Sequence, residues 1–275
     1  MITVPKIKNF PKGEKIIAVT AYDRPSAISA QDAKVDVVLV GDSLSNVVLG
    51  NKNTTSIGIK EISYHLEAVS KFIDKSLLVA DLPFGSSQAG LQIASQHSCE
   101  LVRKGANAVK IEGGKEVCSL VEHLTGHGIP VMSHIGLTPQ KVEQFGGYKV
   151  QGKNLENSQK IYEEAKLLES AGAFSIVLEC IPFQLAKKIT EDLYVPTIGI
   201  GSGSFCRGQI LVFHDLIGWQ NENFKFLKNP FGNVSKNIHD AINSFSDSVK
   251  SGTYPALNES WSLDEDVIEK IKKFK

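Results

Sequence analysis

Four short segments of this chain run mainly through β-branched and apolar residues, and each run leads into an acid. The runs are 35–40 before Asp42, 77–80 before Asp81, 108–111 before Glu112 and 176–178 before Glu179. A largely apolar run without two-fold alternation is typical of a parallel strand that is covered on both faces. Active sites of such α/β proteins form at the carboxyl ends of the strands, so we expect these acids to converge on one pocket.

Composition favours small-molecule chemistry. The 275 residues are 42% hydrophobic, which is enough for a full core, and 30 basic residues balance 30 acidic ones. This balance removes the long-range attraction on which nucleic-acid and anionic-membrane binders rely, so we expect neither as a partner. The first fifteen residues contain no continuous apolar segment of a secretion signal, and the four cysteines form no CxxC pair. We therefore expect a reduced, cytoplasmic protein.

Strand-like and helix-like segments alternate along the whole chain. Strands are predicted at 16–22, 35–41, 76–81, 108–112, 129–134, 174–179, 195–200 and 209–214, and helices at 24–34, 60–74, 88–104, 115–127, 156–171, 182–192 and 234–250. Eight strands in this alternation predict a single (β/α)₈ TIM barrel domain over 1–275. Only about six residues separate 199–203 from the last strand, so either a one-turn helix replaces the seventh helix or the boundaries there are wrong.

Two connections are long enough to indicate function. They are 44–59 and 135–155, and both leave from strand ends that lie near the candidate acids. Long ordered loops in compact domains are usually functional, so we expect both to cover the same face of the barrel. The tail 255–275 ends in an amphipathic segment, which we interpret as a surface or oligomer-contact helix.

Three carboxylates would lie on adjacent strands of the barrel. Asp42, Asp81 and Glu112 end the second, third and fourth strands, and Ser43 adds a hydroxyl beside the first acid. Oxygen ligands with room for water suit Mg²⁺, which takes only one or two protein carboxylates. The alternative is helix capping, because an acid at a strand-to-helix turn is a common N-cap. Asp23, before Arg-Pro, is interpreted as a cap.

Three further residues are candidates for binding or catalysis. Lys110 precedes Glu112 by two, so on a strand both side chains point to the same side, as an ion pair or as an anchor for a substrate carboxylate. His134 ends the fifth strand, either as a core histidine or as a site residue. Glu179 has no basic neighbour until Lys187, and this apolar setting suits a general base, with a helix cap before Pro182 as the alternative.

Taken together, these strings resemble the ketopantoate hydroxymethyltransferase family. The matching strings are TAYD (20–23), VGDS (40–43), ADLPF (80–84), VKIEGG (109–114), GLTPQ (136–140), FGGYKVQGK (145–153), LEC (178–180), GIGSG (199–203) and GQILVFHD (208–215). The resemblance implies a (β/α)₈ enzyme of pantothenate biosynthesis that transfers a one-carbon unit from 5,10-methylenetetrahydrofolate to 2-oxoisovalerate. It also implies one Mg²⁺ per subunit and a large homo-oligomeric ring, a decamer.

The resemblance also implies roles for individual residues. Asp42 and Asp81 would be magnesium ligands with Glu112 at the metal, and Ser43 and Lys110 would hold the ketoacid. His134 would line the same pocket, and Glu179 would be the proton acceptor. Two departures from the family pattern are Arg207, where an acid is expected, and Ser202, where alanine is usual.

Two other functions compete with this interpretation. One is another Mg²⁺-dependent barrel of the phosphoenolpyruvate mutase and isocitrate lyase type. Such lyases have a loop rich in Lys and Cys that carries a catalytic cysteine. Segment 83–90 has no cysteine, and 114–120 has only Lys115 and Cys118, so neither is such a loop. The other is a catalytically silent barrel that serves as a scaffold, which has no need of a costly buried charge cluster.

Overall fold

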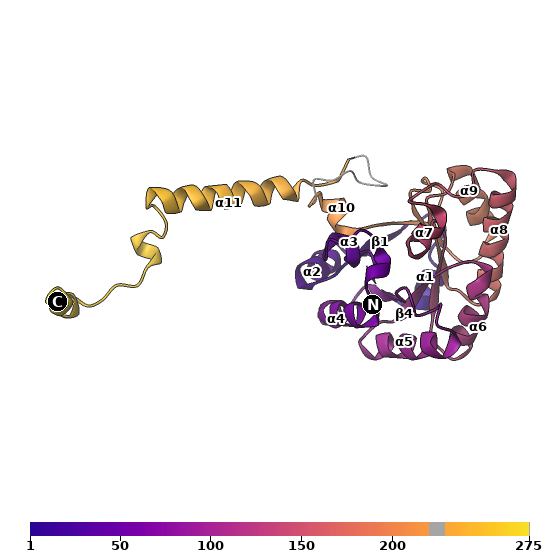
Figure 1. Cartoon of the computed structure of the whole chain (residues 1–275), viewed down its shortest axis with the longest axis horizontal. Coiled ribbons are helices and arrows are strands. Elements are labelled where there is room, and N and C mark those ends of the chain that lie inside the picture. Colours follow the sequence, from indigo (N-terminus) through magenta and orange to yellow (C-terminus); the bar gives the residue numbers. More distant parts are fainter. Residues whose placement is uncertain (220–228, 275) are drawn as a thin grey trace. The chain divides into compact units, whose positions relative to one another are not determined.

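The computed structural model describes residues 1–219 and 229–274 (Figure 1). Its sheet is a closed barrel of eight parallel strands in sequential order, in which β8 pairs with β1 through Ile16 and Gly208. The strands are β1 (Ile16–Thr20), β2 (Val37–Val40), β3 (Leu77–Asp81), β4 (Ala108–Glu112), β5 (Val131–Gly136), β6 (Ser175–Glu179), β7 (Thr197–Ile200) and β8 (Gly208–Leu211). The predicted (β/α)₈ TIM barrel is confirmed.

Helices alternate with most of these strands. The α-helices are α1 (Val4–Lys8), α2 (Arg24–Asp32), α3 (Leu44–Val47), α4 (Ile59–Ser70), α5 (Leu91–Arg103), α6 (Cys118–Gly126), α7 (Val142–Phe145), α8 (Leu155–Ser170), α9 (Phe183–Asp192), α10 (Phe213–Ile217), α11 (Val234–Ser251) and α12 (Glu265–Ile271). Short 3₁₀ helices are η1 (Thr54–Ser56), η2 (Lys115–Val117), η3 (Pro139–Lys141) and η4 (Leu257–Glu259).

Local chemistry explains where several of these elements begin and end. The side chain of Asp23 accepts a hydrogen bond from the backbone of Ser26 at the start of α2, which confirms the predicted cap. Gly105 follows the last turn of α5 with a φ of 112°, a conformation that glycine adopts without strain. Every residue of β2, β3, β4 and β6 is buried, as expected for strands covered on both faces.

The N-terminal segment packs into the core of the barrel. Ile7 of α1 is fully buried in a cluster with residues from the strands, and Ile2 and Phe10 pack against this cluster. Arg207, just before β8, donates hydrogen bonds to the carbonyls of Phe10 and Pro11 at 2.8 and 3.0 Å. The departure at Arg207 therefore has a structural role, because it ties the N-terminal segment to the β7–β8 connection.

The boundaries predicted near the end of the barrel are wrong, which was one of the two alternatives given for the short connection before the last strand. The last strand ends at Leu211 rather than at 214, and Phe213 begins α10. A short apolar run looks alike in a strand and in a buried helix, which explains this error. The connection from β7 to β8 contains turns and bends but no one-turn helix over 201–207. The predicted helix 115–127 is likewise divided into η2 and α6.

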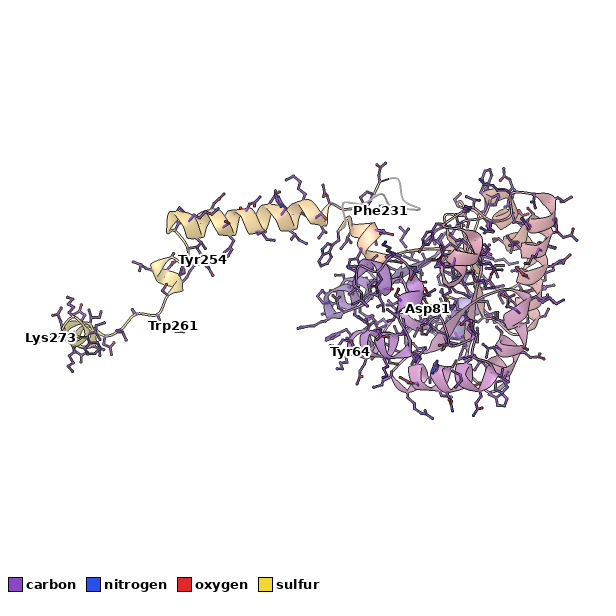
Figure 2. The ribbon with its side chains drawn as sticks, viewed as in Figure 1. Tyr64, Asp81, Phe231, Tyr254, Trp261 and Lys273 are labelled. Carbon is purple, nitrogen blue, oxygen red and sulfur yellow. The ribbon has the colours of Figure 1, made fainter. Side chains whose placement is uncertain are left out.

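The described residues fall into two compact units. The barrel unit contains Met1–Leu216, and a C-terminal unit contains 217–219 and 230–274. From 231 to 274 no residue is buried, and Trp261 is fully exposed (Figure 2). A single domain over 1–275 stays a prediction. None of the described helices has the length and apolar character needed to cross a membrane.

Candidate active site

Six of the predicted site residues are buried at the carboxyl ends of neighbouring strands. Asp81, Glu112 and Glu179 are the last residues of β3, β4 and β6, while Asp42 lies two residues after β2. Lys110 and His134 lie within β4 and β5, and all six side chains belong to residues at most 7% exposed. Asp81 is labelled among the barrel strands in Figure 2.

Direct contacts join Asp42, Asp81 and Glu112 into one cluster. The backbone N–H of Asp42 donates to Oδ2 of Asp81 at 2.9 Å, and Lys110 Nζ donates to Oδ1 of Asp81 at 2.6 Å. The same ammonium lies 3.4 Å from Oε1 of Glu112. Lys110 and Glu112 thus point to the same side of β4, as their spacing predicts.

His134 connects this group to Glu179. Its Nδ1 lies 3.3 Å from Oε1 of Glu112, and its Nε2 lies 3.3 Å from Oε2 of Glu179. Both are ionic contacts rather than well-aligned hydrogen bonds, because neither ring nitrogen has a hydrogen-bond partner among the described residues. The expectation that Glu179 has no base nearby is therefore wrong. Lys187 is the next base along the sequence, but His134 on the adjacent strand is the neighbour in space.

Burial and nearby charges act together on the ionisation of this cluster. Burial, and then the charges of Glu112 and Asp81, raise the pKa of Asp42 well above its usual value. Burial lowers the pKa of Lys110, but Asp81 and Glu112 outweigh it and raise the pKa above its usual value. Against burial, Lys110 and His134 lower the pKa of Glu112 to about 2. Glu112 in turn outweighs burial at His134 and raises that pKa to about 9.

The structure does not support helix capping by these acids. The N-cap residues of α3, α5 and α9 are Ser43, Gly90 and Pro182, and none of them makes a side-chain cap hydrogen bond. Asp81 accepts hydrogen bonds from Lys110 and from the backbone of Asp42 instead. Its carboxylate is thus part of the charge cluster and not of a helix terminus.

Two buried residues that the sequence reasoning missed complete the cluster. Tyr22 lies after β1, and its hydroxyl is 2.7 Å from Oγ of Ser43. Gln140 lies in η3, where its backbone N–H donates to Glu112 and its side chain donates to Asp42. Gln140 belongs to the long connection 135–155, which was predicted to be functional, and it ends the family-like string GLTPQ (136–140).

The backbone around Glu179 is held by close contacts. Cys180 follows it with a φ of 52°, which is unusual for a residue other than glycine. A Cβ on Gly136 would lie 2.3 Å from the Glu179 carbonyl oxygen, so only glycine fits there. Ser202 donates from Oγ to the carbonyl of Leu178 at 2.6 Å, immediately before Glu179. The departure at Ser202 therefore adds a contact next to the proposed base.

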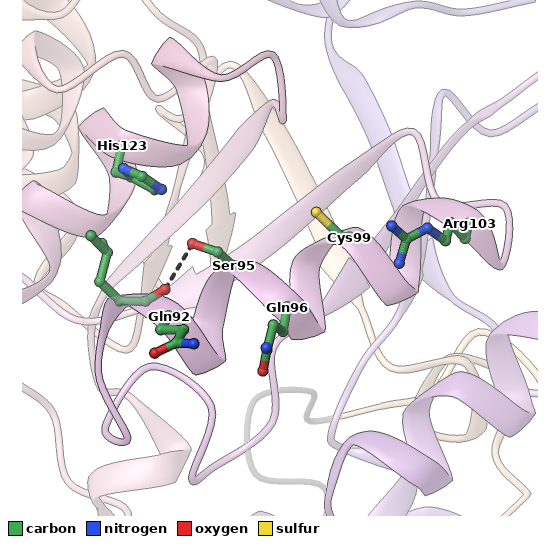
Figure 3. A pocket seen from close by; sticks show the side chains of 7 residues that line it. Gln92, Ser95, Gln96, Cys99, Arg103 and His123 are labelled. Carbon is green, nitrogen blue, oxygen red and sulfur yellow. Dashed lines mark hydrogen bonds between the residues drawn. The ribbon is translucent and has the colours of Figure 1, made fainter.

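A separate groove lies along α5 and α6 (Figure 3). In it, Oγ of Ser95 donates to the carbonyl of Leu91 at 2.7 Å, a local contact within α5. The side chains that line the groove are Leu91, Gln92, Ser95, Gln96, Cys99, Arg103 and His123. None of them belongs to the charge cluster, so we do not assign the reaction to this groove.

A parallel eight-stranded barrel with buried acids at its strand ends defines the class of (β/α)₈ enzymes. The family model described as ketopantoate hydroxymethyltransferase matches residues 1–257, and the chain belongs to this family of hydroxymethyltransferases. It is 47% identical over 255 residues to the 3-methyl-2-oxobutanoate hydroxymethyltransferase of Ignicoccus hospitalis, covering 93% of this chain and 97% of the relative. It is 46% identical over 273 residues to that of Carboxydothermus hydrogenoformans, covering 98% and 99%.

Solved structures with the same fold are more distant in sequence. A phosphoenolpyruvate phosphomutase from Streptomyces platensis subsp. rosaceus aligns with a TM-score of 0.62 at 12% identity and covers 98% of this chain and 94% of its own. A 2,3-dimethylmalate lyase aligns with a TM-score of 0.59 at 15% identity and covers 99% and 95%. At such identities the likeness is one of fold alone, and the family match distinguishes this chain from these two enzymes.

Proposed function

We propose that this enzyme forms ketopantoate by transferring a hydroxymethyl group from 5,10-methylenetetrahydrofolate to 2-oxoisovalerate, with Mg²⁺ as its cofactor. Relatives at 46–47% identity along nearly their whole length bear the name of this activity. The observation that carries the proposal is the continuous contact network from Asp42 through Asp81, Lys110, Glu112 and His134 to Glu179. This network combines the carboxylates of Asp42, Asp81 and Glu112, which could hold a cation, with the separate carboxylate of Glu179, which could act as a base.

The donor set fits a magnesium ion. Asp42 and Asp81 would be ligands, and Glu112 would contact the ion through water. Among the described residues, no three His, Cys, Asp or Glu side chains already form a metal cage. Mg²⁺ does not need one, because it uses one or two protein carboxylates and completes its shell with water and substrate oxygens. When bound, the ion would supply Lewis-acid polarisation of the C2 carbonyl of the ketoacid.

The chain's own residues would bind the ketoacid and move its proton. The ammonium of Lys110 has three N–H donors, and two of them face Asp81 and Glu112. The third would bind the substrate carboxylate together with Ser43. Glu179 would take the proton from C3. Water would release the methylene carbon of the folate as formaldehyde, with both of its C–N bonds broken and the folate left as tetrahydrofolate. The electron pair of the C3–H bond would then form the C–C bond to this carbon, and the resulting alkoxide would take the proton held by Glu179. His134 would support Glu179 as the proton arrives.

The activity itself gives the first test. Purified protein with 2-oxoisovalerate, methylenetetrahydrofolate and Mg²⁺ should produce ketopantoate, measured by mass spectrometry. EDTA should reduce product to background, and Mg²⁺ in excess of the chelator should restore it, because the carbonyl needs polarisation. Product formed equally well with EDTA present would contradict a metal requirement. Absence of product under every condition, with cleavage of dimethylmalate instead, would favour a lyase.

We also propose that the enzyme is a cytoplasmic homo-oligomer, a decamer. All four cysteines are free. The apolar side chains of Ile242, Phe245 and Val249 on α11 are 61%, 56% and 48% exposed, a surface suited to contact another subunit. The number ten comes from the family resemblance, and on it light scattering at micromolar concentration should give ten times the mass of one chain. A monomer at that concentration would contradict the assembly.

A further inference from the structure

Gln140 is a buried polar residue that lies between the acids of the cluster. It is the middle residue of η3, in the connection that follows β5, and it is 5% exposed. Burial of an amide without hydrogen bonds costs free energy, so the partners of Gln140 show what holds it in place.

Every donor of Gln140 faces an acceptor at the active site. Its backbone N–H donates to Oε2 of Glu112 at 3.0 Å. Its side-chain Nε2 donates to Oδ2 of Asp42 at 3.0 Å and to the carbonyl of Leu82 at 2.9 Å. An amide nitrogen carries two hydrogens, so these two bonds use its full capacity. The carbonyl of Leu82 can only accept, which fixes the orientation of the amide.

The effect of these bonds is to orient two carboxylates without adding charge. Among the described residues, the bond from Gln140 is the only hydrogen bond that reaches the Asp42 side chain, and it uses Oδ2. Oδ1 of Asp42 is left for another partner. At Glu112, Gln140 engages Oε2, while Oε1 faces Lys110 and His134. Because the amide of Gln140 is neutral, its hydrogen bonds do not cancel the negative charge of the carboxylates that would attract a cation.

We propose that Gln140 is a positioning residue that orients Asp42 and Glu112 for the divalent cation. This inference rests on the metal site of the proposed function. Residues that hydrogen-bond to metal ligands fix their orientation, and their loss typically weakens metal affinity by a factor of about 10 to 100. Gln140 joins the ends of β2 and β4 to the loop after β5, so it also makes the site depend on how that loop folds.

The test variant is Gln140→Met in the full-length chain. Methionine has nearly the same length and keeps the backbone bond to Glu112, but it removes both side-chain bonds. With Mn²⁺ as the probe, free ion measured by electron paramagnetic resonance should give a dissociation constant about 10 to 100 times that of the wild type. Turnover should fall most at low metal and recover in part as the metal concentration is raised, because Gln140 contacts no reacting atom.

A control and a second variant make the result interpretable. Gln159→Met removes a Gln-to-carboxylate bond to Glu163 on the exposed face of α8 and should leave Mn²⁺ affinity unchanged. Gln140→Asn keeps the amide but is one methylene too short, and should also weaken Mn²⁺ binding. Wild-type affinity in folded Gln140→Met would overturn the inference.

Failure of the inference can be distinguished from failure of the metal site. Loss of folding in both Gln140 variants, seen by circular dichroism, would identify a structural residue and overturn the positioning role. A wild-type protein that binds no Mn²⁺ would refute the metal site itself, and with it the role of Gln140. Weaker Mn²⁺ binding only in the Gln140 variants would support both.

Discussion

Replacing Glu179 by glutamine should lower turnover by a factor of about 10² to 10⁴, the usual worth of a positioned general base. Glutamine keeps the shape of the side chain, and the surrounding contacts from Ser202 and Gly136 involve the backbone, so they remain. The amide cannot take a proton from C3 of the ketoacid. Binding of 2-oxoisovalerate and Mg²⁺ should persist, because Glu179 is not among the proposed ligands of either.

Isotope exchange measures this step without the folate. Wild-type enzyme with Mg²⁺ should exchange the C3 hydrogen of 2-oxoisovalerate for deuterium in D₂O, and Glu179→Gln should not. Glu191→Gln is the matched control, because Glu191 is an exposed partner of Lys187 on α9 and lies outside the cluster. Exchange at the wild-type rate in Glu179→Gln would assign the base to another group, with His134 the next candidate.

The sequence predicted the strands and their acids well because those signals are local. A mainly apolar run of three to six residues that leads into an acid marks both the strand and the position of its carboxylate. Sequential strand order in a barrel then brings Asp42, Asp81 and Glu112 to one end. The last strand was misjudged because the apolar residues after Leu211 are equally compatible with the start of a helix.

Contacts between distant segments could not be predicted in the same way. Gln140 reaches Asp42 across 98 positions of the chain, and this depends on the 3₁₀ turn of η3 inside a long loop. Glu179 was expected to have an apolar setting because its sequence neighbours are apolar. Its charged neighbour, His134, comes from the adjacent strand, and sequence spacing carries no information about the reach of a side chain between strands.

Replacing Asp81 by asparagine should strongly weaken the binding of Mn²⁺ or Mg²⁺, because it removes the charge of a proposed ligand. The loss of affinity should exceed the factor of about 10 to 100 that is typical when a residue hydrogen-bonded to a ligand is replaced. Asparagine has the same shape, and its carbonyl oxygen can accept one of the two bonds now made by Lys110 and the backbone of Asp42. Lys110 keeps Glu112 at 3.4 Å as a charged partner. The loss of folding stability should therefore be limited to about 1–3 kcal/mol, the cost of one bond to a charged group.

Metal titration and thermal unfolding together decide the role of Asp81. Isothermal titration with Mn²⁺ should give a strongly increased dissociation constant for Asp81→Asn, while circular dichroism shows a folded barrel. Asp266→Asn serves as control, because Asp266 forms an exposed surface pair with Lys270 on α12 at 3.7 Å and should change neither measurement. Unfolding of Asp81→Asn at room temperature would indicate that the carboxylate is needed mainly to neutralise buried Lys110. Unchanged Mn²⁺ affinity in a folded variant would remove Asp81 from the ligand set.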